Sequence, residues 1–202
     1  TKIEACANKY TFVWKKAITK NMAKLLTKIS DLVKECEEFY GIKLIYKDKV
    51  QMKHVKKLRK KLYELKKLEG IEFVHGCGKR KTTLQKSIEK LEEYLLKFKE
   101  YNKKVYTCGN RNSYSKTDNG ATFFRMKRDY MGNDQLLPGY NIQMGLCDEY
   151  IAVFDVKQYA SDMDCFQPLM NKFNHTYGRY PEYPVADAGY GSFNNYLYCE
   201  EH

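Results

Sequence analysis

Hydrophobic residues in the first half of the chain recur at the three- and four-residue spacings of long helices. The longest series steps by 4 and 3 without a break: Ile18, Met22, Leu25, Ile29, Leu32, Cys36 and Phe39. Shorter series run from Val55 to Leu65 and from Leu84 to Phe98. Because short connections between long helices favour antiparallel neighbours, we predict an antiparallel three-helix bundle or coiled-coil arm over residues 15–106.

In the second half the spacing changes to two, which is typical of strands. Residues 140–146 and 151–156 alternate in this way, and the four residues between them predict an antiparallel hairpin. A helical spacing follows over residues 162–177. Residues 110–119 are polar and rich in turn formers, so they predict a loop after the helices.

Asp187 follows a short apolar run near the end of the chain. Residues 185–186 predict a buried strand, and residues 193–199 predict a helix with Ser192 as its N-cap. The order strand, strand, helix, strand, helix predicts an α/β (α+β) sheet domain over residues 107–202. Because such sheets present active-site groups at the carboxyl ends of their strands, Asp187 is a candidate site residue. An Asp that forms a turn and caps the next helix explains the same position equally well.

The charge of the chain is divided unevenly between these halves. Its 202 residues carry a formal net charge of +11. Residues 1–106 hold 28 Lys and Arg against 13 Asp and Glu, a charge of +15, whereas residues 107–202 hold 8 against 12, a charge of −4. This division predicts a polyanion-binding region joined to a region with another purpose.

Composition narrows the class of protein further. With 43% hydrophobic residues the chain is not of the disordered type, and no apolar run reaches the length of about 18 to 20 residues that spans a bilayer. We therefore expect a soluble, cytoplasmic protein without a membrane partner. Because the first residue is Thr1, we expect the chain to be a piece of a longer protein.

A cluster of basic residues in the second predicted helix is the candidate nucleic-acid contact. It comprises Lys53, Lys56, Lys57, Arg59, Lys60 and Lys61. This helix offers only Glu64 and Glu69 to balance the cluster, so its basic residues repel one another. DNA phosphates would reduce this repulsion. A merely solvated helix face is the alternative interpretation.

The seven cysteines are scattered, odd in number and without a Cys-x-x-Cys pair. This pattern indicates reduced thiols rather than a disulfide framework. His75 and Cys77, two residues apart, leave a structural zinc site open as the alternative.

Several segments together resemble the DDE-type transposases of bacterial insertion sequences. The segments are residues 1–5, 8–10, 12–14, 117–118, 126–127, 138–143 and 186–190. The opening Thr-Lys-Ile-Glu-Ala resembles the sequence that follows the first catalytic Asp of this family. The run Ala186-Asp187-Ala188-Gly189-Tyr190 resembles its second catalytic motif.

The resemblance implies a partial RNase H-like sheet domain that begins in residues 1–14, is interrupted by the helical insertion 15–106 and continues, incomplete at its C-terminus, in residues 107–202. In this family two Asp and one Glu hold two divalent ions, Mg²⁺ or Mn²⁺, that promote DNA cleavage and strand transfer. Only Asp187 matches one of these carboxylates, as a catalytic residue and metal ligand. The first Asp would precede Thr1 and the Glu would follow His202, so we expect the piece to be inactive alone.

The resemblance also implies partners and a place in the cell. We expect DNA, as transposon ends and target, a homo-oligomer formed through the helical arm, and a bacterial protein associated with the nucleoid. For Asp118 we expect a structural, loop-ordering role. The alternative function is a non-enzymatic coiled-coil module that binds nucleic acid or acts as an adaptor.

Overall fold

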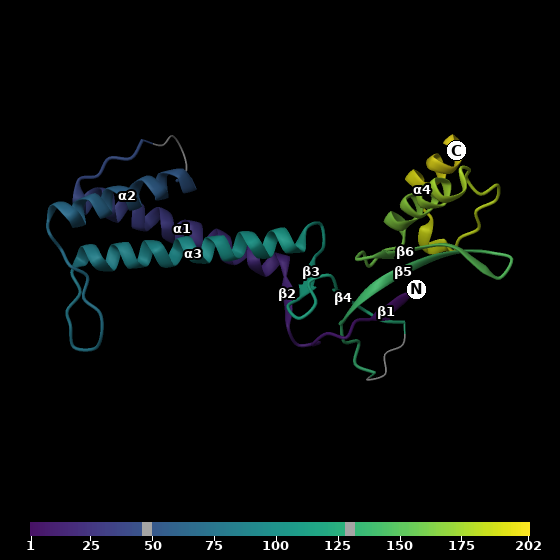
Figure 1. Cartoon of the computed structure of the whole chain (residues 1–202), viewed down its shortest axis with the longest axis horizontal. Helices are drawn as coiled ribbons and strands as arrows, with labels where there is room; N and C mark the ends of the chain where they lie inside the picture. The colour runs from purple at the N-terminus through teal and green to yellow at the C-terminus, as the bar shows by residue number, and fades with distance from the viewer. Residues whose placement is uncertain (46–49, 128–131) are drawn as a thin grey trace. The chain divides into compact units, whose positions relative to one another are not determined.

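The computed structural model of the chain describes residues 1–45, 50–127 and 132–202 (Figure 1). The chain divides into two compact units. The sheet unit comprises Thr1–Lys15 and Thr107–His202, and the helical unit comprises Lys16–Tyr106.

The helical unit contains α2 (Met52–Leu68) and most of α1 (Lys15–Tyr40) and α3 (Thr83–Cys108). The three helices meet in one apolar core, in which Ile29, Leu58 and Ile88 are almost completely buried. Of the predicted heptad positions of the first helix, Leu25, Ile29, Leu32 and Cys36 lie in this core. Ile18 is buried outside it, Met22 is half-buried and Phe39 is exposed. The three predicted helices are therefore confirmed.

The directions of these helices differ from the expected antiparallel alternation. α1 and α2 run the same way, and α3 runs opposite to both (Figure 1). Tyr40 at the end of α1 lies near Glu69 at the end of α2, whose charge contributes after burial to raising the pKa of the Tyr40 phenol. The same phenol lies 3.5 Å from the Ser87 hydroxyl near the start of α3.

The connection from Tyr40 to Met52 explains this difference. Its 11 residues can span roughly 36 Å when extended, whereas α2 is roughly 25 Å long, so the connection is long enough for α2 to run in the same direction as α1. Because α3 runs opposite to α1, the end of α3 lies near the start of α1. The Lys15 N–H donates to the Asn112 carbonyl at 2.9 Å.

The sheet unit is built around the long strand β5 (Leu137–Cys147). β1 (Lys2–Glu4) pairs with one edge of β5, and β4 (Thr122–Phe124) and β6 (Tyr150–Lys157) pair with the other, all antiparallel. A separate two-stranded ladder joins β2 (Phe12–Trp14) to β3 (Ser113–Ser115).

Two helices complete the sheet unit. α4 (Phe166–Tyr177) follows the short helical turn Met163–Cys165, and it buries Phe166 and Leu169 on the same side of the sheet as Val153. α5 (Phe193–Glu201) begins at Ser192, whose hydroxyl oxygen accepts from the Asn195 N–H at 3.2 Å. The predicted hairpin, the helix over residues 162–177 and the Ser192 cap are confirmed, and so is a mixed α and β fold.

The predicted buried strand at residues 185–186 is wrong. These residues have no regular structure and pair with no described strand, and Val185 is 95% exposed. A short apolar run becomes a strand only where a neighbouring strand offers hydrogen-bond partners. The predicted loop 110–119 also differs in part, because it contains β3.

Candidate functional site

Asp187 begins the helical turn Ala188–Tyr190 in the sheet unit. One of its carboxylate oxygens, Oδ1, accepts a hydrogen bond from the Gly189 N–H at 2.8 Å. The capping role that the sequence left open is therefore present. The side chain is exposed, and no described residue donates to Oδ2, so this oxygen remains available to a ligand.

A polar network anchors this turn to the central strand. Asn141 and Gln143 on β5 are each 1% exposed, and both amides donate to Asp162 Oδ1, at 2.6 and 3.0 Å. The Gln143 carbonyl oxygen in turn accepts from the Tyr190 phenol. The hydrogen bonds from Asp162 to Gln143 and from Gln143 to Tyr190 thus connect three parts of the sheet unit. These are the residue before the helical turn Met163–Cys165, the strand β5 and the turn that Asp187 begins.

The network changes the ionisation of its members. Burial tends to raise the pKa of Asp162, but the amide hydrogen bonds and nearby positive charges outweigh burial and lower it below the ordinary value of 3.8. The pKa of Tyr190 is raised by burial first, and then by the charges of Asp162 and Asp187. At neutral pH the network therefore holds an ionised carboxylate beside a neutral phenol.

Gly189 lies between the two carboxylates. A Cβ added there would lie 2.9 Å from Asp187 Oδ1 and 3.5 Å from Asp162 Oδ2. The absence of a side chain therefore lets the turn close against both acids.

These residues offer few oxygen ligands to a divalent metal. Mg²⁺ prefers octahedral oxygen ligands and commonly takes one or two carboxylates with waters and substrate phosphates. Asp187 offers one free oxygen, but the amides already hold Oδ1 of Asp162. Among the described residues no three His, Cys, Asp or Glu side chains lie close enough together to hold a metal. The residues present do not fit a complete two-metal centre.

Asp118 orders a loop of the sheet unit, as expected. Its carboxylate accepts from the Gly120 N–H at 3.0 Å, and both of its oxygens lie 2.9 Å from the Tyr140 hydroxyl. These contacts fasten the 118–120 turn to β5.

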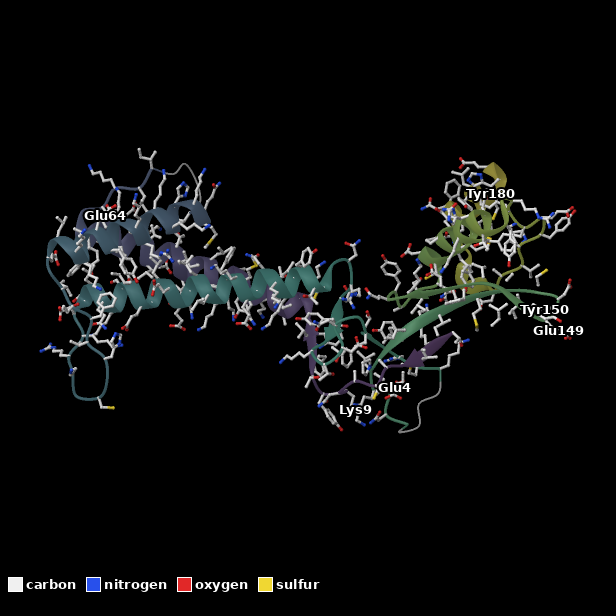
Figure 2. All side chains as sticks on the ribbon, in the orientation of Figure 1. Glu4, Lys9, Glu64, Glu149, Tyr150 and Tyr180 are labelled. Carbon is white, nitrogen blue, oxygen red and sulfur yellow. The ribbon has the colours of Figure 1, made fainter. Side chains whose placement is uncertain are left out.

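The second candidate site lies on α2 in the helical unit. Lys53, Lys56, Lys57 and Lys60 are exposed and follow the spacing of a single helix face; we call these four residues the α2 lysine face. The opposite side of α2 buries apolar residues in the core. Within the described ranges none of the four lysines has an ion-pair partner, and Glu64 is the acid that follows them along α2 (Figure 2).

The other two residues of the predicted basic cluster are placed differently. The Lys61 ammonium donates to the Lys43 carbonyl at 3.1 Å, so it supports the connection before α2. Arg59 is exposed at the flank of α2, near Tyr63. The structure therefore separates the six predicted residues into a face of four and two flanking groups.

The α2 lysine face is electrostatically costly. Lys53 and Lys56 lie in the first turns of α2, at the positive end of the helix dipole. By contrast, α3 neutralises Lys97 with Glu93 and Lys104 with Glu100. An anion at α2 would relieve both the dipole and the repulsion between lysines.

Sequence reasoning missed the role of Asp162, which it placed at a helix start. The signal was present as two amide side chains, Asn141 and Gln143, on the inward face of an otherwise apolar strand. Buried amides require polar partners, and Asp162 supplies one.

Comparisons with protein-family models, with curated proteins and with solved structures give no match to this chain. In the part of the chain that the structure describes, no helix has the length and apolar character needed to cross a membrane.

Proposed function

We propose that the chain is part of a DNA transposase. In this proposal the α2 lysine face contacts DNA phosphates, and the sheet unit contributes Asp187 to a site that cleaves and joins DNA strands. The observation that carries the DNA contact is the cluster of four exposed lysines without an acidic partner among the described residues. The motif resemblance around residues 1–5 and 186–190 supports the transposase.

Phosphate contact follows from the chemistry of this face. Lysine ammonium groups neutralise phosphates as point charges and release the counterions condensed on DNA, which favours binding at low salt. The face holds no aromatic or amide side chain that could recognise base edges. We therefore expect binding that depends strongly on salt and weakly on DNA sequence.

Asp187 has a separate role in this proposal. It would be one of three carboxylates in a longer protein, where Mg²⁺ or Mn²⁺ would polarise the phosphate and activate the attacking oxygen. Because the described residues do not complete such a site, we expect this chain to bind DNA without cleaving it. The proposal further includes a homo-oligomer acting on transposon ends and target DNA in the bacterial cytoplasm, at the nucleoid.

The test of DNA contact is a salt titration of binding to a short duplex, followed by fluorescence anisotropy. One variant changes Lys53, Lys56, Lys57 and Lys60 to Gln. The matched control changes four lysines that have acidic partners: Lys81, Lys97, Lys104 and Lys172. Both variants lower the net charge from +11 to +7, so the comparison separates the place of the charge from its total.

We expect the α2 variant to bind DNA far more weakly. The slope of its plot of log K against log salt should be less negative by roughly 3 to 4. The control should keep most of the affinity and slope. Equal losses in both variants would show a general effect of net charge. Absence of binding by the unchanged chain would remove the DNA role.

The cap made by Asp187 favours a second candidate, a nucleic-acid-binding or adaptor module without catalysis, because capping alone accounts for that residue. The full-length protein distinguishes the two through Asp187→Asn. Asn keeps a carbonyl oxygen for the cap but removes the charge. Loss of Mg²⁺-dependent nicking with unchanged DNA binding supports the transposase, whereas absence of nicking by the unchanged full-length protein on its own DNA ends supports the module.

A further inference from the structure

The strand β5 has an unpaired stretch along its β1 edge. The β1–β5 ladder extends to Thr1, whose carbonyl accepts from the Ile142 N–H at 2.7 Å. Because backbone groups of alternate residues point to the same edge, those of Met144 and Leu146 point to this edge too. No described strand pairs with them there.

A segment without regular structure lies across from this edge. Residues 183–186 have no regular structure, and the side chains of Tyr183 and Val185 are 82% and 95% exposed. A cavity of about 480 Å³ separates the two, lined by Met144 and Leu146 on one side and by Tyr183 and Val185 on the other. One wall is therefore the strand backbone of β5, and the other is an irregular segment with exposed apolar side chains.

The base of this cavity is also apolar. Phe166, Leu169 and Met170 of α4 line it, together with Val153 of β6. Its volume lies in the range of protein binding clefts, roughly 300 to 1,000 Å³. An apolar groove beside unpaired strand backbone is the environment in which proteins bind an added strand.

We propose that this groove binds an extended apolar strand, antiparallel to β5 and in line with β1. This is the place that residues N-terminal to Thr1 take in a longer form of the chain. Continuity with the existing ladder fixes the occupant and its register. The residue two positions before Thr1 pairs with Met144, and the residue four positions before pairs with Leu146.

The added strand has two consequences. It satisfies the backbone groups of Met144 and Leu146, and it covers Val185 and the apolar base of the groove. It also brings a strand end beside the Asp187 turn, since Asp187 lines the same cavity. The inference rests on the ladder and the groove, and it holds whether or not the chain acts on DNA.

The test adds five residues before Thr1, Val-Thr-Val-Thr-Val, to the whole chain. The matched control carries Pro at the position two before Thr1, where the N–H would donate to Met144. Both extensions move the α-ammonium of Thr1 away from Asp162, so that change cancels between them. Hydrogen exchange of the Met144 and Leu146 amides, resolved by NMR, is the measurement.

We expect exchange at these two amides to slow at least about tenfold with the Val-Thr extension and to remain fast with the Pro control. Val185→Asp in the extended chain should reverse much of the protection. Unchanged exchange in a folded, extended chain would overturn the proposal, and so would equal protection by the Pro control.

Discussion

The Asn141 amide donates to the Asp162 carboxylate at 2.6 Å. This bond joins the centre of β5 to the residue before the helical turn Met163–Cys165, which leads into α4. Twenty-one residues separate the two along the chain. Gln143, two residues further along β5, adds a second bond to the same oxygen. By accepting both hydrogen bonds, Asp162 offsets the free-energy cost of burying two amide groups.

Replacing Asp162 by Ala should lower the free energy of unfolding by about 2 to 4 kcal/mol, because both amide donors would be left buried without an acceptor. Urea unfolding measures the change. Asp164→Ala is the matched control, since Asp164 is exposed two residues away. Equal stability of the two variants would show that water replaces the carboxylate without cost.

The same carboxylate should make stability depend on pH. Its folded pKa lies below 3.8, so the stabilisation is fully present above the unfolded pKa and is lost as pH falls through the folded value. We expect the stability difference between the unchanged chain and Asp162→Ala to shrink steadily below about pH 4. A difference that stays constant from pH 6 to pH 3 would contradict the role of the charge.

Local patterns predicted the helices because a heptad spacing is visible within a few turns. They could not give the direction of α2, which depends on how far the connection from Tyr40 to Met52 can reach. The strands β1 to β4 escaped prediction for a related reason. Each has three residues, too few for an alternating pattern, and each owes its form to a distant partner.

The candidate site residues likewise include some that the sequence could predict and some that it could not. The α2 lysine face could be predicted because it needs only helical spacing and a count of acids. The anchoring of Asp187 could not, since Gln143 and Tyr190 meet across 47 residues. An apolar pair at 185–186 predicts a strand by composition, but only a paired neighbour makes it one.

Arg111 is a second buried group that local sequence did not reveal, because it lies in the segment predicted as a polar loop. The residue is 9% exposed. Its guanidinium donates to the carbonyls of Thr107, Cys108, Asn119 and Gly120 and to the Thr122 hydroxyl. The group thus fastens the end of α3 to the turn before β4. Its contacts use the planar fork of the guanidinium.

Arg111→Lys should therefore lower the free energy of unfolding by about 2 to 4 kcal/mol, although the charge is retained, because three ammonium donors cannot reach these acceptors. Arg125→Lys is the control at an exposed position with one long contact, 3.8 Å, to Asp134. Chemical denaturation of both variants measures the effect. A tolerated Arg111→Lys would mean that charge alone holds this junction.

The tip of the β5–β6 hairpin holds strain that a substitution should release. Glu149 lies at this tip (Figure 2). Asp148 and Glu149 both have positive φ, 48° and 70°, as a two-residue hairpin turn with positive φ at both positions requires. Changing the pair to Asn-Gly should raise the free energy of unfolding by about 1 kcal/mol. Glu149→Ala is the control, because it removes the charge and keeps the strain. Thermal unfolding that shows no gain for Asn-Gly over Ala would contradict this turn geometry.

The cysteines should separate into two reactivity classes. Cys6, Cys77, Cys147 and Cys199 are exposed, whereas Cys36, Cys108 and Cys165 are buried. Burial raises the pKa of the Cys165 thiol to about 11, so its thiolate fraction at pH 8 is on the order of 10⁻³.

Because the thiolate is the reactive form, brief iodoacetamide treatment of the folded chain should modify the four exposed cysteines and spare the three buried ones. Mass spectrometry after proteolysis identifies the sites, and the same treatment in urea, which should modify all seven, is the control. Cys165 tests the packing of α4 most directly, since it lies beside Phe166 at the start of that helix. Its rapid modification in the folded chain would show that α4 separates readily from the sheet, and the groove proposed between β5 and residues 183–186 would then lose its apolar base.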